Sequence, residues 1–229
     1  MYTKIIDKNG SRVCSMNPAD EIHVVENKLT VADQLIKNRE EYPNKNFLGY
    51  HSNPTDPYSW ISYSKFLDQV KDLGSGIDFI LSNNSSKFVG IYGKTCYQWV
   101  LSQYSLTFYS RITSPLYDTL GEQAREYIIN HVEIDCCICF DVSLAKKILS
   151  NKNCDRVNCF ILMVEGNLEE IRGQHVNKKF YNLSELPKVD DTFMLNFTSG
   201  STGNPKGVII THNMIMKTMA SVYRFNTFV

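Results

Sequence analysis

The feature that most constrains the fold is an alternation, between residues 88 and 164, of short apolar runs with segments whose apolar residues recur every three or four positions. A short apolar run is typical of a buried β-strand, and the longer spacing is typical of a helix with one buried face. The expected strands are Phe88–Tyr92, Ile112–Leu116, Cys136–Phe140 and Cys159–Val164, and the expected helices are Tyr97–Phe108, Glu122–His131 and Ser143–Leu149. This alternation predicts an α/β fold in which a mostly parallel sheet is covered by helices.

Further elements are expected on either side of this region. One helix should run from Val31 to about Tyr42. Another should begin near Ser62, because a stripe of apolar residues follows at Phe66, Val70, Leu73, Ile77 and Ile80. Strands 193–197 and 208–210 should precede a helix from about Asn213 that is capped by Thr211. Residues 1–28 lack periodicity and should form an irregular extension or a short hairpin, which leaves residues 29–229 as one domain.

The composition argues against several classes of protein. Lys and Arg total 24 of the 229 residues, and Asp and Glu also total 24, so no excess of positive charge points to a nucleic acid partner. The apolar stretches are far shorter than the roughly 18 residues of a membrane-spanning helix, and residues 1–10 do not read as a secretory signal. We therefore expect a reducing compartment, the cytoplasm, as the location.

The chain has seven cysteines, an odd number that does not suggest a disulfide framework. Cys136, Cys137 and Cys139 fall in one expected strand, where adjacent side chains point to opposite faces and cannot converge on one zinc ion. We interpret the cysteines as buried, inert thiols and predict no metal site.

The segment most informative about function lies between two expected strands. Its sequence is Phe197-Thr198-Ser199-Gly200-Ser201-Thr202-Gly203-Asn204-Pro205-Lys206-Gly207-Val208. The glycines let backbone N–H groups approach a ligand, the four hydroxyl side chains add donors, and Lys206 adds a positive charge. A loop with these donors and no carboxylate is suited to an anion of distributed charge, of which a polyphosphate is the obvious example.

Other interpretations of this loop fit less well. A polar surface turn would not require the flanking strands or the closing Pro205-Lys206-Gly207. A Walker loop needs Gly-Lys followed by Ser or Thr and then a helix, whereas here a strand follows Lys206. The Gly-x-Gly-x-x-Gly fingerprint of dinucleotide-binding folds is also missing from the sequence.

The segment from Thr198 to Gly207, with the following Thr211-His212, resembles the signature of the adenylate-forming (AMP-binding) superfamily, which includes acyl-CoA synthetases, luciferases and peptide-synthetase adenylation domains. Within that superfamily, several further segments resemble the N-terminal part of eukaryotic long-chain fatty acyl-CoA synthetases: Asn46–Tyr50, Tyr58–Tyr63, Gly74–Gly76 and Pro115–Gly121. The resemblance extends from about Leu29 to Val229.

The resemblance implies a two-step reaction. A fatty acid carboxylate attacks the α-phosphate of ATP, supplied with Mg2+, and coenzyme A then displaces AMP to give the thioester. It also implies that Lys206 is catalytic, stabilising the departing pyrophosphate. The residues it assigns to nucleotide binding are Thr198, Ser199, Gly200, Ser201, Thr202, Gly203, Lys206 and Gly207.

Structural roles are expected for the other residues that invite a functional interpretation. His131 should fall on the apolar side of its helix, and His212 should lie at a junction between a strand and a helix. We expect Asp118 to be a turn or cap residue, and Trp60 and Trp99 to be core or packing residues.

The sequence also departs from the family. Segments expected to bind adenine, ribose and the acyl chain, and the mobile C-terminal lid domain, have no counterpart before Val229. We therefore expect a fragment of a long-chain fatty acid:CoA ligase, inactive without the remainder and prone to self-association through exposed apolar surface, with any membrane association residing in the missing parts. The alternatives are a non-catalytic nucleotide-binding or interaction module and a ligase for another carboxylic acid.

Overall fold

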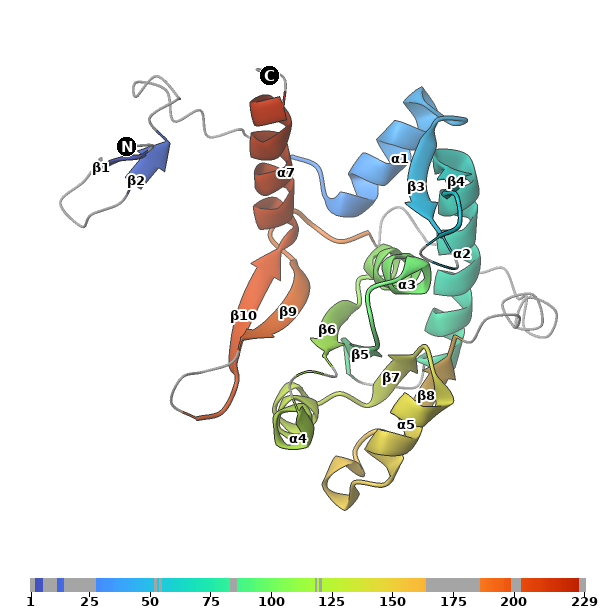
Figure 1. Ribbon diagram of the computed structural model, residues 1–229, viewed down its shortest axis with the longest axis vertical. Coiled ribbons are helices and arrows are strands. Elements are labelled where there is room, and N and C mark those ends of the chain that lie inside the picture. Colours follow the sequence, from blue (N-terminus) through green and yellow to red (C-terminus); the bar gives the residue numbers. More distant parts are fainter. Residues whose placement is uncertain are drawn as a thin grey trace.

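The computed structural model describes residues 3–5, 12–14, 28–51, 53, 55–82, 86–117, 119, 121–163, 186–198 and 203–226 (Figure 1). Its centre is a six-stranded sheet with the strand order β10-β9-β6-β5-β7-β8. In chain order these strands are β5 (Phe88–Tyr92), β6 (Ile112–Leu116), β7 (Cys136–Cys139), β8 (Cys159–Leu162), β9 (Thr192–Thr198) and β10 (Lys206–Thr211). The pairings from β9 to β8 are parallel and β10 pairs antiparallel with β9. The predicted mostly parallel sheet is confirmed.

Helices cover both faces of this sheet (Figure 1). On one face, α2 (Tyr63–Ile80) and α3 (Tyr97–Phe108) share a core with β5, β7 and β8, and α1 (Val31–Glu41) packs on the outside of α2 and α3. On the other face, α4 (Gly121–Val132) and α5 (Val142–Leu149) form a second core with β5, β6 and β7. Strand β5 contributes to both cores: Ile91 faces the first and Tyr92 the second, and neither is exposed to solvent. The full burial of these central strands explains their apolar sequences.

Local sequence signals account for where several helices begin. Thr30 caps α1 in a capping box with Asp33, and the Ser62 hydroxyl accepts a hydrogen bond from the Lys65 amide at the start of α2. The predicted cap at Thr211 is confirmed, because its hydroxyl oxygen accepts a hydrogen bond from the Met214 amide at 3.3 Å in α7 (His212–Asn226). A short 3-10 helix, η2 (Lys152–Cys154), follows α5.

Two small antiparallel pairs lie outside the central sheet. Strands β1 (Thr3–Ile5) and β2 (Arg12–Cys14) pair as a hairpin, one of the two forms expected for the N-terminal segment. Strands β3 (Asn46–Tyr50) and β4 (Ser59–Ser62) form the other pair. Of the two roles expected for Trp60, core or packing, the core position is wrong and the packing role fits, because its side chain is 56% exposed. Its ring nevertheless packs over Gly49, where an added Cβ would lie 3.0 Å from the ring atoms. Trp99 is half-buried against the first core, as expected.

Candidate phosphate-binding site

The segment singled out by its hydroxyls and glycines joins β9 to β10. The two strands pair antiparallel, with Lys206 opposite Thr198 and Gly207 opposite Phe197. Lys206 and Thr198 therefore face each other at the two ends of the loop. The Thr198 hydroxyl donates a hydrogen bond to the Lys206 carbonyl oxygen at 3.5 Å, which links the two ends of the loop. The antiparallel pairing therefore places the hydroxyl of Thr198 and the positively charged residue Lys206 side by side at the base of the loop.

The described part of this loop is exposed. Thr198, Gly203, Lys206 and Gly207 are all solvent-accessible, so the hairpin is not sealed inside the molecule. Gly203 has φ +143°, a conformation that residues with a side chain rarely adopt. Ser199, Gly200, Ser201 and Thr202 lie outside the described residues. The geometry seen at both ends of the loop is compatible with a backbone that approaches a ligand closely.

Phe197 anchors the hairpin to the rest of the fold. Its side chain is 4% exposed and belongs to the second core. Gly207 faces it from the opposite strand, where an added Cβ would lie 3.2 Å from the ring. A glycine at position 207 therefore lets the aromatic ring of Phe197 pack without displacement.

The loop stands at the edge of the sheet where parallel strands end. Because β9 is parallel to β6, their carboxyl ends meet at the same edge. The Tyr117 hydroxyl, one residue past β6, donates a hydrogen bond to Asn196 Oδ1 at 3.4 Å. Helices α3 and α4, which follow β5 and β6, cover opposite faces of the sheet, so the chain leaves these two neighbouring strands in opposite directions. In open α/β sheets, ligands bind at the carboxyl ends of strands where the connections diverge in this way. Tyr117 was not among the predicted site residues, although it lies within the Pro115–Gly121 segment on which the resemblance rests.

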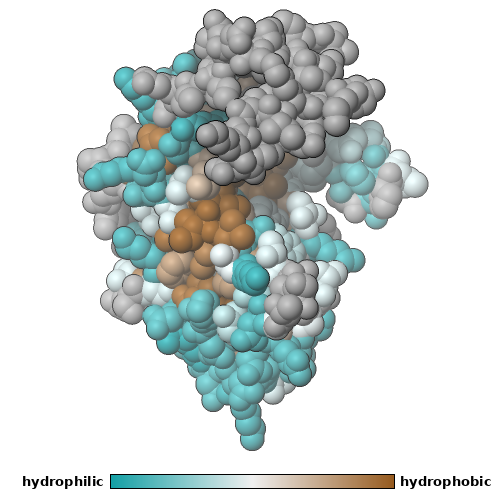
Figure 2. All heavy atoms as spheres, turned by 90° about the vertical axis from the view of Figure 1, so that its left-hand side faces the viewer, coloured by the Kyte–Doolittle hydropathy of each residue, from teal (hydrophilic) through white to brown (hydrophobic). Residues whose placement is uncertain are grey.

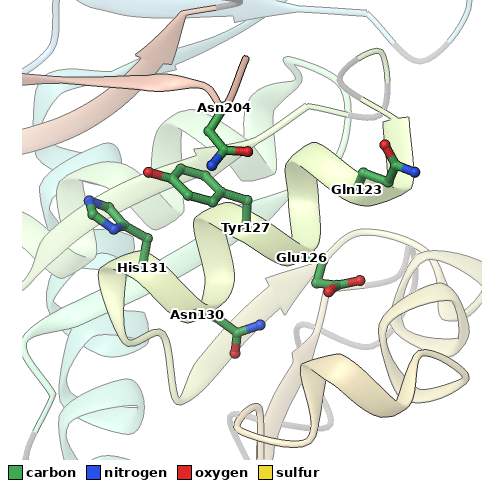
Figure 3. Close-up of a pocket in the computed structure, with 6 residues that line it drawn as sticks. All are labelled: Gln123, Glu126, Tyr127, Asn130, His131 and Asn204. Atoms are coloured by element: carbon green, nitrogen blue, oxygen red, sulfur yellow. The ribbon is translucent and has the colours of Figure 1, made fainter.

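An open pocket of about 500 Å³ lies between α4 and this hairpin (Figure 3). Its lining consists of Gln123, Glu126, Tyr127, Asn130, His131 and Asn204. The His131 ring stacks on Tyr127 with ring centroids 5.1 Å apart, and the Asn204 side chain lies over Tyr127 from the loop side. The expectation that His131 lies on the apolar face of its helix is wrong, because its side chain is exposed.

His212 occupies a structural position, as expected from its place between a strand and a helix. It is 2% exposed, and its Nδ1 accepts a hydrogen bond from the Val31 amide at 3.2 Å, which ties α7 to α1. Burial lowers the pKa of His212 to about 4, although the carboxylates of Asp191 and Asp33 act in the opposite direction. The imidazole is therefore neutral at neutral pH and serves as an acceptor. Asp118 lies outside the described residues.

The described residues contain no cluster of three or more His, Cys, Asp or Glu side chains able to hold a metal ion. In the same part of the chain, no helix is long and apolar enough to span a bilayer.

Comparison with known proteins identifies the family. The profile of the AMP-binding enzymes matches residues 35–228. The chain belongs to the AMP-binding enzyme family. Among its relatives, long-chain-fatty-acid–CoA ligase 5 of Rattus norvegicus is 31% identical over 78% of this chain, and long chain acyl-CoA synthetase 1 of Arabidopsis thaliana is 28% identical over 83% of it. These alignments span only 29% and 32% of the two relatives' own lengths.

Solved structures of adenylate-forming enzymes share the fold. Fatty acyl CoA synthetase of Mycobacterium tuberculosis superposes with a TM-score of 0.61 at 15% identity, over 80% of this chain and 34% of that one. The predicted α/β class and the likeness to one part of an adenylate-forming enzyme are thus confirmed, and the family terms ligase and acyl-CoA synthetase agree with the names of its relatives.

Proposed function

We propose that this chain forms the ATP-phosphate-binding part of a long-chain fatty acid:CoA ligase. The observation that carries the proposal is the β9–β10 loop of an AMP-binding family member, whose described residues Thr198, Gly203 and Lys206 are exposed at the carboxyl ends of the parallel strands. In the reaction, a fatty acid carboxylate attacks the α-phosphate of MgATP to form an acyl-adenylate and pyrophosphate. The thiol of coenzyme A then displaces AMP. The names of the relatives support a long-chain fatty acid as the substrate class.

The loop acts through position and charge. Backbone N–H groups near the glycines and the hydroxyls of Thr198, Ser199, Ser201 and Thr202 donate hydrogen bonds to the β- and γ-phosphates, which fixes the α-phosphate for in-line attack. Lys206 stabilises the negative charge of the departing pyrophosphate. A pair of unit charges about 4 Å apart gains roughly 4 kcal/mol at an effective dielectric constant near 20, before the cost of desolvation. A fraction of that free energy is enough to change the adenylation rate substantially.

The surroundings of the reaction are part of the same proposal. Residues 29–229 make up part of the AMP-binding domain and residues 1–28 an extension to it. The described cysteines are free thiols, which supports the cytoplasm or the cytoplasmic face of an intracellular membrane as the location. Apolar side chains gather on the face that carries β10 and α7 (Figure 2), where Val208, Ile209 and Met214 are about half exposed or more. We propose self-association through this face when nothing else covers it.

The test is fatty-acid-dependent exchange of pyrophosphate into ATP, measured in a complete enzyme that contains residues 29–229. Lys206→Ala should lower the exchange rate by about tenfold to a thousandfold, the range found when one preorganised donor is removed from an active site. Lys87→Ala is the matched control. Lys87 is an exposed lysine just before β5, at the amino ends of the parallel strands and therefore away from the loop.

Two results would reject parts of the proposal. An exchange rate unchanged by Lys206→Ala removes the role given to that residue. Nucleotide binding without any fatty-acid-dependent exchange would instead favour the non-catalytic nucleotide-binding module, and exchange driven only by other carboxylic acids would correct the substrate class.

A further inference from the structure

Two cysteines far apart in the sequence are neighbours in the sheet. Cys136 is the first residue of β7, Cys159 is the first residue of β8, and the two pair directly in the parallel register Cys136↔Cys159. Both side chains lie on the face covered by α2 and α3, since Cys136 is part of the first core and Cys159 packs against it. Cys137 and Cys139 belong to the second core. The sheet therefore pairs Cys136 with Cys159 and excludes the two cysteines nearest to Cys136 in sequence.

The two thiols are also neighbours inside one core, because Cys136 and Cys159 stand in direct register and both pack in the first core. Adjacent strands lie about 4.8 Å apart, and disulfide-linked residues have Cα atoms about 4.4–6.8 Å apart. An S–S bond between residues in direct register thus requires only local adjustment. Strand β8 can make that adjustment, because it lies at the edge of the described sheet and pairs with a strand on one side.

The environments of the two sulfurs differ. Cys136 is 1% exposed, as expected for a buried thiol, but Cys159 is half-buried, so the expectation that the cysteines are all buried is wrong there. Interaction with the Cys136 thiol lowers the pKa of Cys159, although partial burial acts against this. The same interaction and burial raise the pKa of Cys136. Because Cys159 is also the more exposed of the two, it is the thiol that an oxidant in solution reaches first, and Cys136 is its buried partner.

We propose that Cys159 and Cys136 are a peroxide-sensitive dithiol pair, in which Cys159 is oxidised first and Cys136 then closes a disulfide between β7 and β8. In the first step the Cys159 thiolate attacks hydrogen peroxide: an S–O bond forms, the O–O bond breaks, and hydroxide leaves. In the second step the Cys136 sulfur attacks the Cys159 sulfur, the S–O bond breaks, and the leaving hydroxide takes the Cys136 proton as water. The two thiols are oxidised by two electrons and the peroxide is reduced; a small dithiol reverses the change.

The experiment is peptide mapping of the 229-residue chain after treatment with hydrogen peroxide and blocking of the remaining thiols. Trypsin releases Cys136 in residues 126–146 and Cys159 in residues 157–172. These two peptides should be recovered as one disulfide-linked species that dithiothreitol separates. Cys159→Ser should abolish the link, and Cys137→Ala, the matched control at the adjacent position on the opposite face, should preserve it.

A second variant keeps the result interpretable. In Cys136→Ala the sulfenic acid on Cys159 has no partner, so it should accumulate and be trapped by dimedone several times more than in the wild type. The proposal is overturned if the linked species survives in Cys136→Ala, which would assign the bond to another cysteine. It is equally overturned if the folded wild-type chain gives no linked species while its thiols are oxidised.

Discussion

The interior strands β5 and β7 and the hairpin β9–β10 belong to one sheet but differ in how they are buried. Every described residue of β7, and all of β5 after Phe88, is buried between helices on both faces. In β10, by contrast, Lys206 to Ile209 are exposed. The interior strands are thus buried on both faces, whereas the hairpin is anchored through β9, where Phe193 and Phe197 are buried, and leaves most of β10 exposed to solvent. Burial provides stability in the middle of the sheet, and exposure at the β10 edge leaves that region accessible to a ligand.

The largest expected difference between the two regions is in stability. Ile138 is 0% exposed at the centre of β7, so Ile138→Ala should lower the free energy of unfolding by about 2–5 kcal/mol through lost burial and an unfilled cavity. Ile209, on β10, is 59% exposed, so Ile209→Lys should change the free energy of unfolding by no more than about 0.5 kcal/mol. Urea unfolding of both variants measures the contrast.

The same pair also tests the exposed face. Ile209→Lys places a charge on the apolar surface of β10 and should reduce concentration-dependent association in sedimentation experiments. If the two variants lost equal stability, the distinction between scaffold and hairpin would be wrong.

A smaller effect is expected at the junction of the hairpin with α1, where His212 lies. Its pKa of about 4 is below the usual value of 6.5, so between these values the unfolded chain binds a proton that the folded chain does not. The contribution of His212 to the free energy of unfolding should therefore be fully present above pH 6.5 and be lost as the pH falls toward 4. The loss should be at most about 1.4 kcal/mol per pH unit, the value for one proton.

The matched variant is His212→Asn, whose side-chain oxygen can accept the Val31 N–H without titrating. The pH dependence of urea unfolding between pH 4 and 6.5 should be shallower in this variant than in the wild type. Identical pH dependence in the two proteins would show that the buried imidazole is not responsible.

Much of the scaffold was predictable because its periodicity is local. The apolar runs and helical stripes placed the elements between residues 88 and 162 to within about one or two residues of their observed ends. His131 was misplaced because the buried stripe of α4 follows Arg125, Ile128, Ile129 and Val132, and residue 131 lies beside that stripe. Arg125 itself is buried because its guanidinium donates to the Tyr92 hydroxyl at 2.9 Å, a partner on a different element.

The candidate site was only partly predictable for a related reason. Residue types and spacing identified the loop from Thr198 to Gly207, because donors, glycines and a lysine are local features. The contacts of Tyr117 with Asn196 and of Cys136 with Cys159 depend on which strands are neighbours, and strand order is set by tertiary packing. Residue type left a core or a packing role open for Trp60, and the structure gives it the packing role, on Gly49 of the neighbouring strand, with 56% of its side chain exposed.

The most direct test of the central claim is a titration of the isotopically labelled chain with MgATP, followed through the backbone amide resonances. We expect the largest shifts in residues 198–207, with binding weakened about tenfold in Lys206→Ala, a loss of about 1.4 kcal/mol, and unchanged in Lys87→Ala. Shifts confined to the pocket lined by Gln123 and His131, or equal affinities in the two lysine variants, would contradict the claim that the β9–β10 loop holds the phosphates.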